Sequence, residues 1–121
     1  MTLIPFSARG IRAHWTLPGS SGVQLAHATD FVSSAGRAGI LTACYAAVLC
    51  HFHETLSVGG QVIGRRRASL GAGELDYVEV QLNQAGQKML GQSKGNRLTV
   101  RVALSDGTRT RMGQVGLVRY S

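Results

Sequence analysis

The stretch TACYAAVLCHFHETLSV (residues 42–58) contains both cysteines of the chain and two of its four histidines. From residue 50 onward, apolar and polar residues alternate, which indicates a β-strand with one buried and one solvated face. The inward set is Cys50, Phe52, Leu56 and Val58. The outward set is His51, His53, Thr55 and Ser57. Glu54 is the exception, because it places a carboxylate on the apolar side.

Further strands are predicted on both sides of this stretch, separated by turn-forming residues. They cover residues 11–17, 23–32, 37–44, 50–58, 61–70, 76–82 and 97–104, and a last strand ends near Arg119. The segment RAGILTAC is apolar on both faces, and Ala38, Ile40, Thr42 and Cys44 form one candidate inward set. About seven or eight short strands predict an all-β fold, an antiparallel β-sandwich. We expect one domain over residues 11–121, preceded by an irregular segment at residues 1–10.

One segment, NQAGQKMLGQSKGN (residues 83–96), breaks the strand pattern. Its glycines lie near the ends or at a tolerated interior site, and Asn83 is a favourable residue to begin a helix. The segment therefore predicts one short helix near residues 84–92, which Met89 and Leu90 would dock against the strands.

The segment RLTVRVAL (residues 97–104) alternates most regularly, and the following Asp106-Gly107 predicts a two-residue hairpin turn. Such a turn would place the inward residue Val102 opposite Arg111. We expect either a bulge near Gly113 or a longer turn to correct this mismatch.

The net charge is +7, and only Lys88 and Lys94 among the thirteen basic residues are lysines. This charge favours anionic partners, such as nucleic acid, an acidic glycan or an anionic surface. The alternative is a set of scattered arginines that serves only solubility. No apolar run is long enough to span a membrane, and residues 1–15 lack the pattern of an intact signal peptide.

The densest basic cluster is Arg65-Arg66-Arg67. Strand alternation would place Arg65 and Arg67 on one face and Arg66 on the other. One interpretation is a solvated edge strand, because edge charges prevent pairing between sheets. The other is a binding patch for an anionic ligand, formed by Arg65, Arg66, Arg67, Arg97, Arg101, Arg109 and Arg111.

The cysteines and histidines are candidates for a zinc site or for a cysteine nucleophile with a histidine base. A regular strand points Cys50 away from His51 and His53, so these residues cannot converge on zinc unless His14 and His27 fold over them. The same alternation separates the Cys50 thiol from a histidine base. The six acidic residues are expected mostly at turns, and no catalytic or nucleotide-binding motif occurs. We therefore expect neither an enzyme nor a metal or cofactor site.

A disulfide between Cys44 and Cys50 fits the spacing better. The five residues between them form a short connection between two strands, and both sulfur atoms would flank its mouth if Cys44 faces inward with Ile40. A chain with two cysteines and no odd thiol suits an oxidising compartment. The alternative is two reduced core thiols in a cytosolic protein.

The segment VEVQLNQAGQKMLGQSKGNRLTVRVALSDGT (residues 78–108) resembles modules of secreted and cell-surface proteins of actinobacteria. In those modules a strand leads into A-G-(basic)-x-L-L and then into an alternating L-x-V-x-V strand. The matching residues here are Leu82, Asn83, Ala85, Gly86, Lys88, Leu90, Leu98, Val100 and Val102. The resemblance covers about residues 30–119 and implies an immunoglobulin-like sandwich that is exported and non-catalytic. His51-Phe52-His53 departs from the family pattern, in which basic and small residues follow the second cysteine.

The sequence thus predicts a non-catalytic extracellular or cell-surface module that acts as a spacer or binding domain with a basic face. Its expected partners are an anionic surface polymer or neighbouring protein modules. Two alternatives remain open: a structural subunit of a virion or filament, and a binder of nucleic acid or acidic glycan. No small-molecule cofactor is expected.

Overall fold

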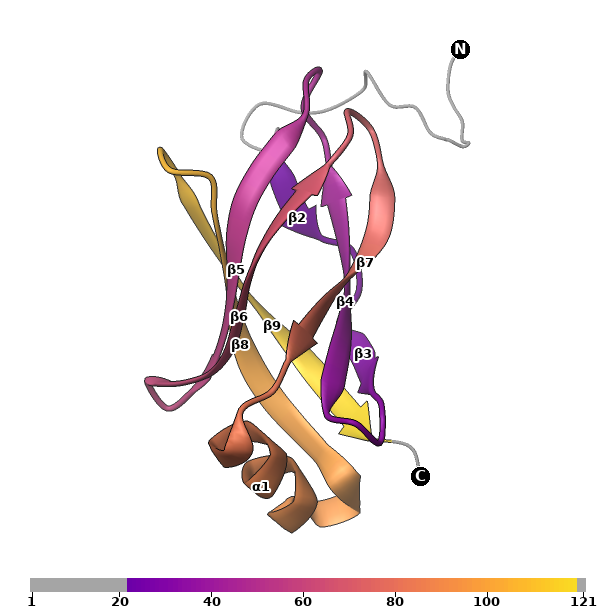
Figure 1. The fold of residues 1–121 in the computed structure, drawn as a ribbon, viewed down its shortest axis with the longest axis vertical. Coiled ribbons are helices and arrows are strands. Elements are labelled where there is room, and N and C mark those ends of the chain that lie inside the picture. The colour runs from indigo at the N-terminus through magenta and orange to yellow at the C-terminus, as the bar shows by residue number, and fades with distance from the viewer. Residues whose placement is uncertain (1–21, 120–121) are drawn as a thin grey trace.

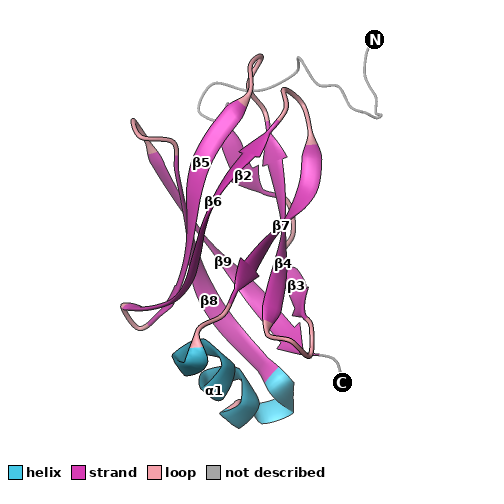
Figure 2. Cartoon of the chain, viewed as in Figure 1, coloured by secondary structure: helices cyan, strands magenta, loops and turns pink. Residues whose placement is uncertain are grey.

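A computed structural model describes residues 22–119, which form eight strands and one short α-helix (Figures 1 and 2). The elements are β2 (Val23–Leu25), β3 (Thr29–Val32), β4 (Arg37–Cys44), β5 (Cys50–Val58), β6 (Gln61–Leu70), β7 (Leu75–Gln81), α1 (Gln84–Gln92), the 3₁₀ helix η1 (Lys94–Asn96), β8 (Arg97–Ser105) and β9 (Thr110–Arg119). The all-β prediction is confirmed. The segment predicted irregular at residues 1–10 and the strand predicted at residues 11–17 lie outside the described residues.

The strands form two layers that are joined along one side (Figure 1). In the first layer, β4 pairs with β7 on one edge and with β2 and β3 on the other. The second layer has the order β9-β8-β5-β6, and β3 joins the layers by pairing in parallel with β9. An immunoglobulin-like sandwich also places its second and fifth strands in one sheet and its third, sixth and seventh in the other. Counting β2 and β3 as a divided first strand, β4 and β7 take the places of the second and fifth strands, and β5, β8 and β9 take those of the third, sixth and seventh. The fourth strand, β6, differs from the constant-type arrangement because it pairs with β5 in the second layer.

The predicted strand at residues 23–32 is divided into two short strands. β2 pairs with the end of β4, whereas β3 pairs with the beginning of β4 and with β9. Because β3 has partners on both edges, the first strand of the sandwich contributes to both layers. Alternation within one strand does not specify such a change of partner.

The two strands of the opening stretch have the predicted orientation. In β4 the candidate inward set is buried, with Ala38, Ile40 and Thr42 fully inaccessible. In β5, Cys50, Phe52 and Leu56 are buried, and Val58 is partly buried. Glu54 keeps the register of β5 and is therefore buried with them. The core lies between the two layers, where these inward faces meet.

The connection between β8 and β9 is longer than the predicted two-residue turn. Ser105 pairs with Thr110, so four residues connect the strands, and Val102 lies opposite Gly113 rather than Arg111. The side chain of Asp106 stabilises this turn, because its Oδ1 accepts hydrogen bonds from the backbone N–H groups of Thr108 and Arg109 at 3.0 and 2.9 Å. The two-residue prediction was wrong and the turn is longer, but the expected correction of the mismatch does not occur, because Arg111 lies opposite the inward residue Leu104.

The predicted helix is confirmed as α1, which lies at one end of the sandwich (Figure 2). Asn83 caps it, since its Oδ1 accepts a hydrogen bond from the Gly86 N–H at 2.9 Å. The helix docks through the buried Leu90 and through Gly86, where a Cβ atom would lie 2.8 Å from the Cβ of Ile63. Met89 is partly buried against the same core.

Candidate binding faces

Cys44 and Cys50 form a disulfide with their Cα atoms 5.9 Å apart. Cys44 ends β4 and Cys50 begins β5, so the bond connects the two layers covalently at one end of the sandwich. Both sulfur atoms of the chain's cysteines are used, and no thiol is left for metal binding or nucleophilic chemistry.

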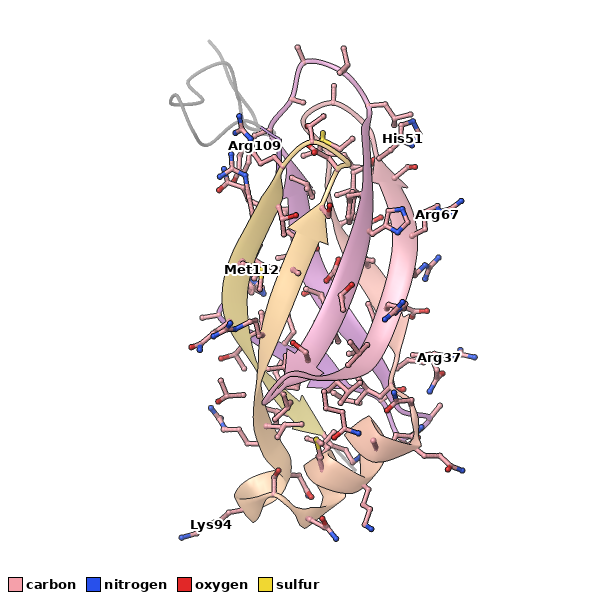
Figure 3. All side chains as sticks on the ribbon, turned by 90° about the vertical axis from the view of Figure 1, so that its left-hand side faces the viewer. Arg37, His51, Arg67, Lys94, Arg109 and Met112 are labelled. Atoms are coloured by element: carbon pink, nitrogen blue, oxygen red, sulfur yellow. A yellow bond between two sulfur atoms is a disulfide. The ribbon has the colours of Figure 1, made fainter. Side chains whose placement is uncertain are left out.

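His51 and His53 point outward from β5, as predicted. The Nδ1 atom of His51 lies 2.8 Å from the hydroxyl of Ser69 on β6 (Figure 3). His27 is placed elsewhere and contacts Asp30, while His14 lies outside the described residues. Within residues 22–119, no group of three or more potential ligands is arranged to hold a metal ion.

Four of the arginines predicted to form the anionic-ligand patch lie on the outer face of the second layer. Residues that are paired across an antiparallel ladder project from the same face of the sheet. Arg67 pairs with the outward His53, and Arg65 pairs with Thr55. Arg101 pairs with Ser57 of β5, and Arg97 projects from the same side of β8. We call this surface the basic face, formed by His51, His53, Arg65, Arg67, Arg97 and Arg101.

No acidic residue lies on the basic face, and all six acidic residues of the chain are within the described part. Asp30 and Glu54 are buried. The other four lie on β7, in the loop before it, or in the β8–β9 connection. The positive charge of the face is therefore not neutralised locally. Arginines arranged in this way attract anions over distances of about 10 Å at moderate salt.

Three predicted patch residues lie away from the basic face. The Nη1 atom of Arg66 donates a hydrogen bond to the backbone carbonyl of Glu79 on β7 at 2.8 Å. Arg109 lies in the β8–β9 connection, apart from Arg67 and His51 (Figure 3). Arg111 pairs with the inward residue Leu104 and is partly buried. Alternation along the strand separated Arg66 from its neighbours, whereas Arg109 lies outside the strands because the turn has four residues instead of two.

Two acidic residues are buried between the layers, contrary to the expectation that acidic residues lie mostly at turns. Asp30 projects from β3, and its Oδ2 accepts a hydrogen bond from the Leu41 N–H at 3.3 Å. Glu54 projects from β5, and among the described residues neither of its carboxylate oxygens has a hydrogen-bond partner. The nearby Thr42 hydroxyl donates to the carbonyl of Ile40 at 3.0 Å instead. The sequence indicated only one of these two buried carboxyl groups, because Glu54 falls on the apolar side of its strand pattern.

Burial governs the ionisation of both carboxyl groups. Removal from water raises the pKa of Glu54 to about 8, and the charge of Asp30 adds to this shift while the proximity of Thr42 opposes it. Burial also raises the pKa of Asp30, although the Leu41 N–H and His27 act in the opposite direction. Glu54 is therefore mainly protonated at neutral pH, as expected of a carboxyl group that is buried among apolar side chains and forms no ion pair with any of the described residues.

The outer face of the first layer has a different composition, which the sequence analysis did not identify as a site. Phe31, Leu75 and Tyr77 are each about half exposed on it. They surround Gly39 and the partly buried Leu41 through the pairs Phe31–Gly39, Leu41–Tyr77 and Ala43–Leu75. We call this surface the aromatic face, formed by Phe31, Gly39, Leu41, Leu75 and Tyr77.

Comparisons of the chain with protein-family models, with curated proteins and with solved structures found no match. Within residues 22–119, no helix is long and apolar enough to cross a membrane. The two outer faces themselves are therefore the features of this chain that bear on its function. One face has uncompensated positive charge, and the other has exposed apolar rings.

Proposed function

We propose that this chain is a non-catalytic binding module that acts outside the cell and attaches to an anionic polymer through its basic face. The observation that carries the proposal is the placement of Arg65, Arg67, Arg97 and Arg101 on one sheet face without any acidic residue. Guanidinium groups bind carboxylate, sulfate and phosphate through paired hydrogen bonds, and their charge persists at every physiological pH.

The shape of the face supports a polymer as the partner. Neighbouring strands lie about 4.8 Å apart, so the arginines of β6 and β8 are separated by roughly 10 Å across the sheet. Such spacing suits successive anionic groups of an extended chain better than one small anion. The disulfide supports export, because disulfides persist in oxidising compartments.

Binding to heparin and to duplex DNA, measured across a series of salt concentrations, tests the proposal. We expect affinity to fall steeply as salt increases, because bound counterions are released. The variants Arg65→Gln/Arg67→Gln and Arg97→Gln/Arg101→Gln should each reduce the slope of log K against log salt on DNA by about 2. Preference for heparin over DNA of equal charge would identify an acidic glycan as the polymer class.

The matched control is Lys88→Gln/Lys94→Gln, which removes the same charge from the helical end of the molecule. Lys94 lies at that end, away from Arg67 (Figure 3). This variant should retain the wild-type slope. Equal losses in the control and the face variants would show that only net charge matters, and no binding at low salt would refute the proposal.

The exposed apolar rings of the aromatic face favour a second candidate, a structural subunit of a virion or filament. Apolar patches on otherwise polar proteins commonly mark interaction surfaces. Light scattering at increasing protein concentration tests this candidate. Growth of open-ended assemblies would support it, whereas a limiting small oligomer or a monomer would contradict it.

A further inference from the structure

The aromatic face contains a groove that is lined by both aromatic and charged side chains. The groove has a volume of about 490 Å³ and is lined by Phe31, Ser33, Arg37, Gly39, Tyr77 and Glu79. The Tyr77 ring leans towards Gly39, where a Cβ atom would lie 3.6 Å from its Cδ1 atom. Because Gly39 has no side chain, the sheet is hollow between the two aromatic residues.

The charges on this face are balanced, in contrast to the basic face. Arg37 on β4 and Glu79 on β7 are both exposed and project from the outer side of neighbouring strands. The Nε atom of Arg37 donates to the Oε1 of Gln81 at 3.3 Å, which holds the guanidinium over the sheet. Among the described residues, neither Arg37 nor Glu79 forms an intramolecular ion pair.

We propose that the aromatic face is a self-complementary docking surface for a second copy of this chain, which forms a closed twofold dimer. In a twofold interface, residue i of one copy contacts residue j of the other, and residue j contacts residue i. A surface with an apolar centre and one charge of each sign meets this requirement. In the proposed dimer each Arg37 lies against a Glu79 of the other copy, and the apolar side chains of the two copies pack together.

Charge complementarity selects a second copy over an anionic polymer at this face. The face has no excess of positive charge to attract a polyanion, because Arg66, which reaches the β7 edge of the face, lies in one hollow with Glu74, Asp76 and Glu79. A dimer joined here also directs the two basic faces to opposite outer sides, because the basic and aromatic faces belong to different layers (Figure 1). The repulsion expected from a net charge of +7 on each copy is thereby reduced.

The interface is small, so the dimer should be weak. Each copy contributes three apolar side chains that are only half exposed, namely Phe31 (53%), Tyr77 (55%) and Leu75 (57%). Interfaces below the standard size have modest affinity, and we expect a dissociation constant on the order of 10–100 μM. The dimer would be favoured where many copies are concentrated along one polymer.

Sedimentation velocity of the full 121-residue chain, from about 5 to 500 μM, tests the proposal. We expect a reversible monomer–dimer equilibrium without larger species. Tyr77→Ser should weaken the dimer at least tenfold. Met112→Ser is the matched control, because Met112 is equally exposed (57%) but projects from the layer with the basic face. It should leave the equilibrium unchanged.

A charge exchange tests the pairing of the two copies. Arg37→Glu should weaken the dimer, since it places two carboxylates together at each contact. Arg37→Glu/Glu79→Arg should restore the dimer, because each pair is re-formed with reversed sign. Far-ultraviolet circular dichroism shows whether each variant is folded. If the charge variants do not fold, the comparison of Tyr77→Ser with its control Met112→Ser still tests the proposal.

Several results would overturn this inference. A wild-type chain that stays monomeric at 500 μM would leave the groove to another occupant, such as a sugar ring. Equal effects of Tyr77→Ser and Met112→Ser would show non-specific association. A charge exchange that restores nothing in a folded protein would exclude the twofold pairing. None of these results would alter the binding of heparin or DNA to the basic face, so the two proposals fail separately.

Discussion

The two outer faces of this sandwich follow the same strand alternation but have opposite character. The basic face combines four arginines with two histidines, whereas the aromatic face combines exposed rings with one charge of each sign. Side chains on the solvent-exposed side of a sheet contribute less to folding than those in the core. Their composition can therefore reflect what each face contacts. The difference supports the proposal that one face makes an ionic contact and the other an apolar contact.

The inner sides of the same layers are nearly uniform and apolar, with the exception of Asp30, Thr42 and Glu54. The two faces can act independently only if the layers behave as one rigid body. Three features hold the layers together: the core around Glu54, the close contact at Gly64, and the disulfide. Each can be tested separately.

The largest expected effect is a loss of stability between about pH 4.5 and 8 that is caused by Glu54. Its pKa is raised from 4.5 to about 8 in the folded state. Between these values the folded protein holds a proton that the unfolded chain releases, so stability is complete below pH 4.5 and falls as pH rises to 8. At about 1.4 kcal/mol per pH unit, the total loss approaches 5 kcal/mol. Urea unfolding from pH 5 to 9 measures it.

Glu54→Gln should remove most of this pH dependence, because the amide does not ionise. Glu79→Gln is the matched control, since Glu79 is exposed on β7. It should keep the wild-type profile when measured at a protein concentration too low for dimers. A wild-type stability that is flat between pH 5 and 9 would mean that the ionised Glu54 is accommodated and that the layers can separate slightly.

The next largest effect concerns Gly64, where β6 closely approaches the end of β7. A Cβ atom at Gly64 would lie 2.9 Å from the Cγ1 of Val80 and 3.0 Å from the carbonyl oxygen of Gln81. Gly64→Ala should therefore destabilise the fold by about 1–3 kcal/mol, because overpacking forces the strands apart.

Gly91→Ala is the control, because it makes the same substitution at a position with room for the added Cβ atom. The nearest atom to a Cβ at Gly91 is 3.9 Å away, and alanine favours the helix α1. Its stability should stay the same or rise by up to about 1 kcal/mol. If thermal unfolding shows equal effects for the two variants, the strands at Gly64 are not in close contact.

The disulfide should contribute an intermediate amount. Closing a loop between cysteines six positions apart stabilises a fold by roughly 2 kcal/mol in the chain-entropy estimate. The double variant Cys44→Ala/Cys50→Ala should lower the unfolding free energy by about this amount while retaining both faces. Two reactive thiols in the denatured, unreduced protein would show that the bond is absent and would weaken the argument for export.

The smallest expected effects come from measuring a variant of each face in both assays, heparin binding and dimerisation. These measurements test the comparison of the two faces most directly. Arg65→Gln/Arg67→Gln should weaken binding to heparin by about tenfold at low salt without changing dimerisation. Tyr77→Ser should weaken dimerisation without changing the affinity of the monomer for heparin. If each variant alters both properties, the faces are coupled.

Much of the fold could be predicted because each strand of a two-layer sheet carries its own alternating pattern. Residues 50–58 and 97–104 showed which side chains point inward, and Asn83 marked the beginning of the helix. The division of residues 23–32 into β2 and β3 could not be predicted, because it depends on which strand lies beside each half.

The candidate sites were less predictable for the same physical reason. Arg66 could be separated from Arg65 and Arg67 by alternation alone. Two extra residues in the turn after β8 give Arg111 the partner Leu104 instead of Val102, but a shift of two residues keeps Arg111 on the inward side that alternation had indicated. The aromatic face was missed because Phe31, Gly39 and Tyr77 are far apart in the chain and become neighbours only through pairing with β4.

The sequence by itself determined the alternation within most strands, the positions of most turns, the capped helix and the sign of the net charge. These properties depend on residues that are neighbours in the chain. Only the tertiary structure decided which strands are adjacent, and hence which outward residues share a face and which carboxyl groups share the core. Register between strands is set by the packing of the whole sandwich, because one slip of a residue moves every side chain to the opposite side.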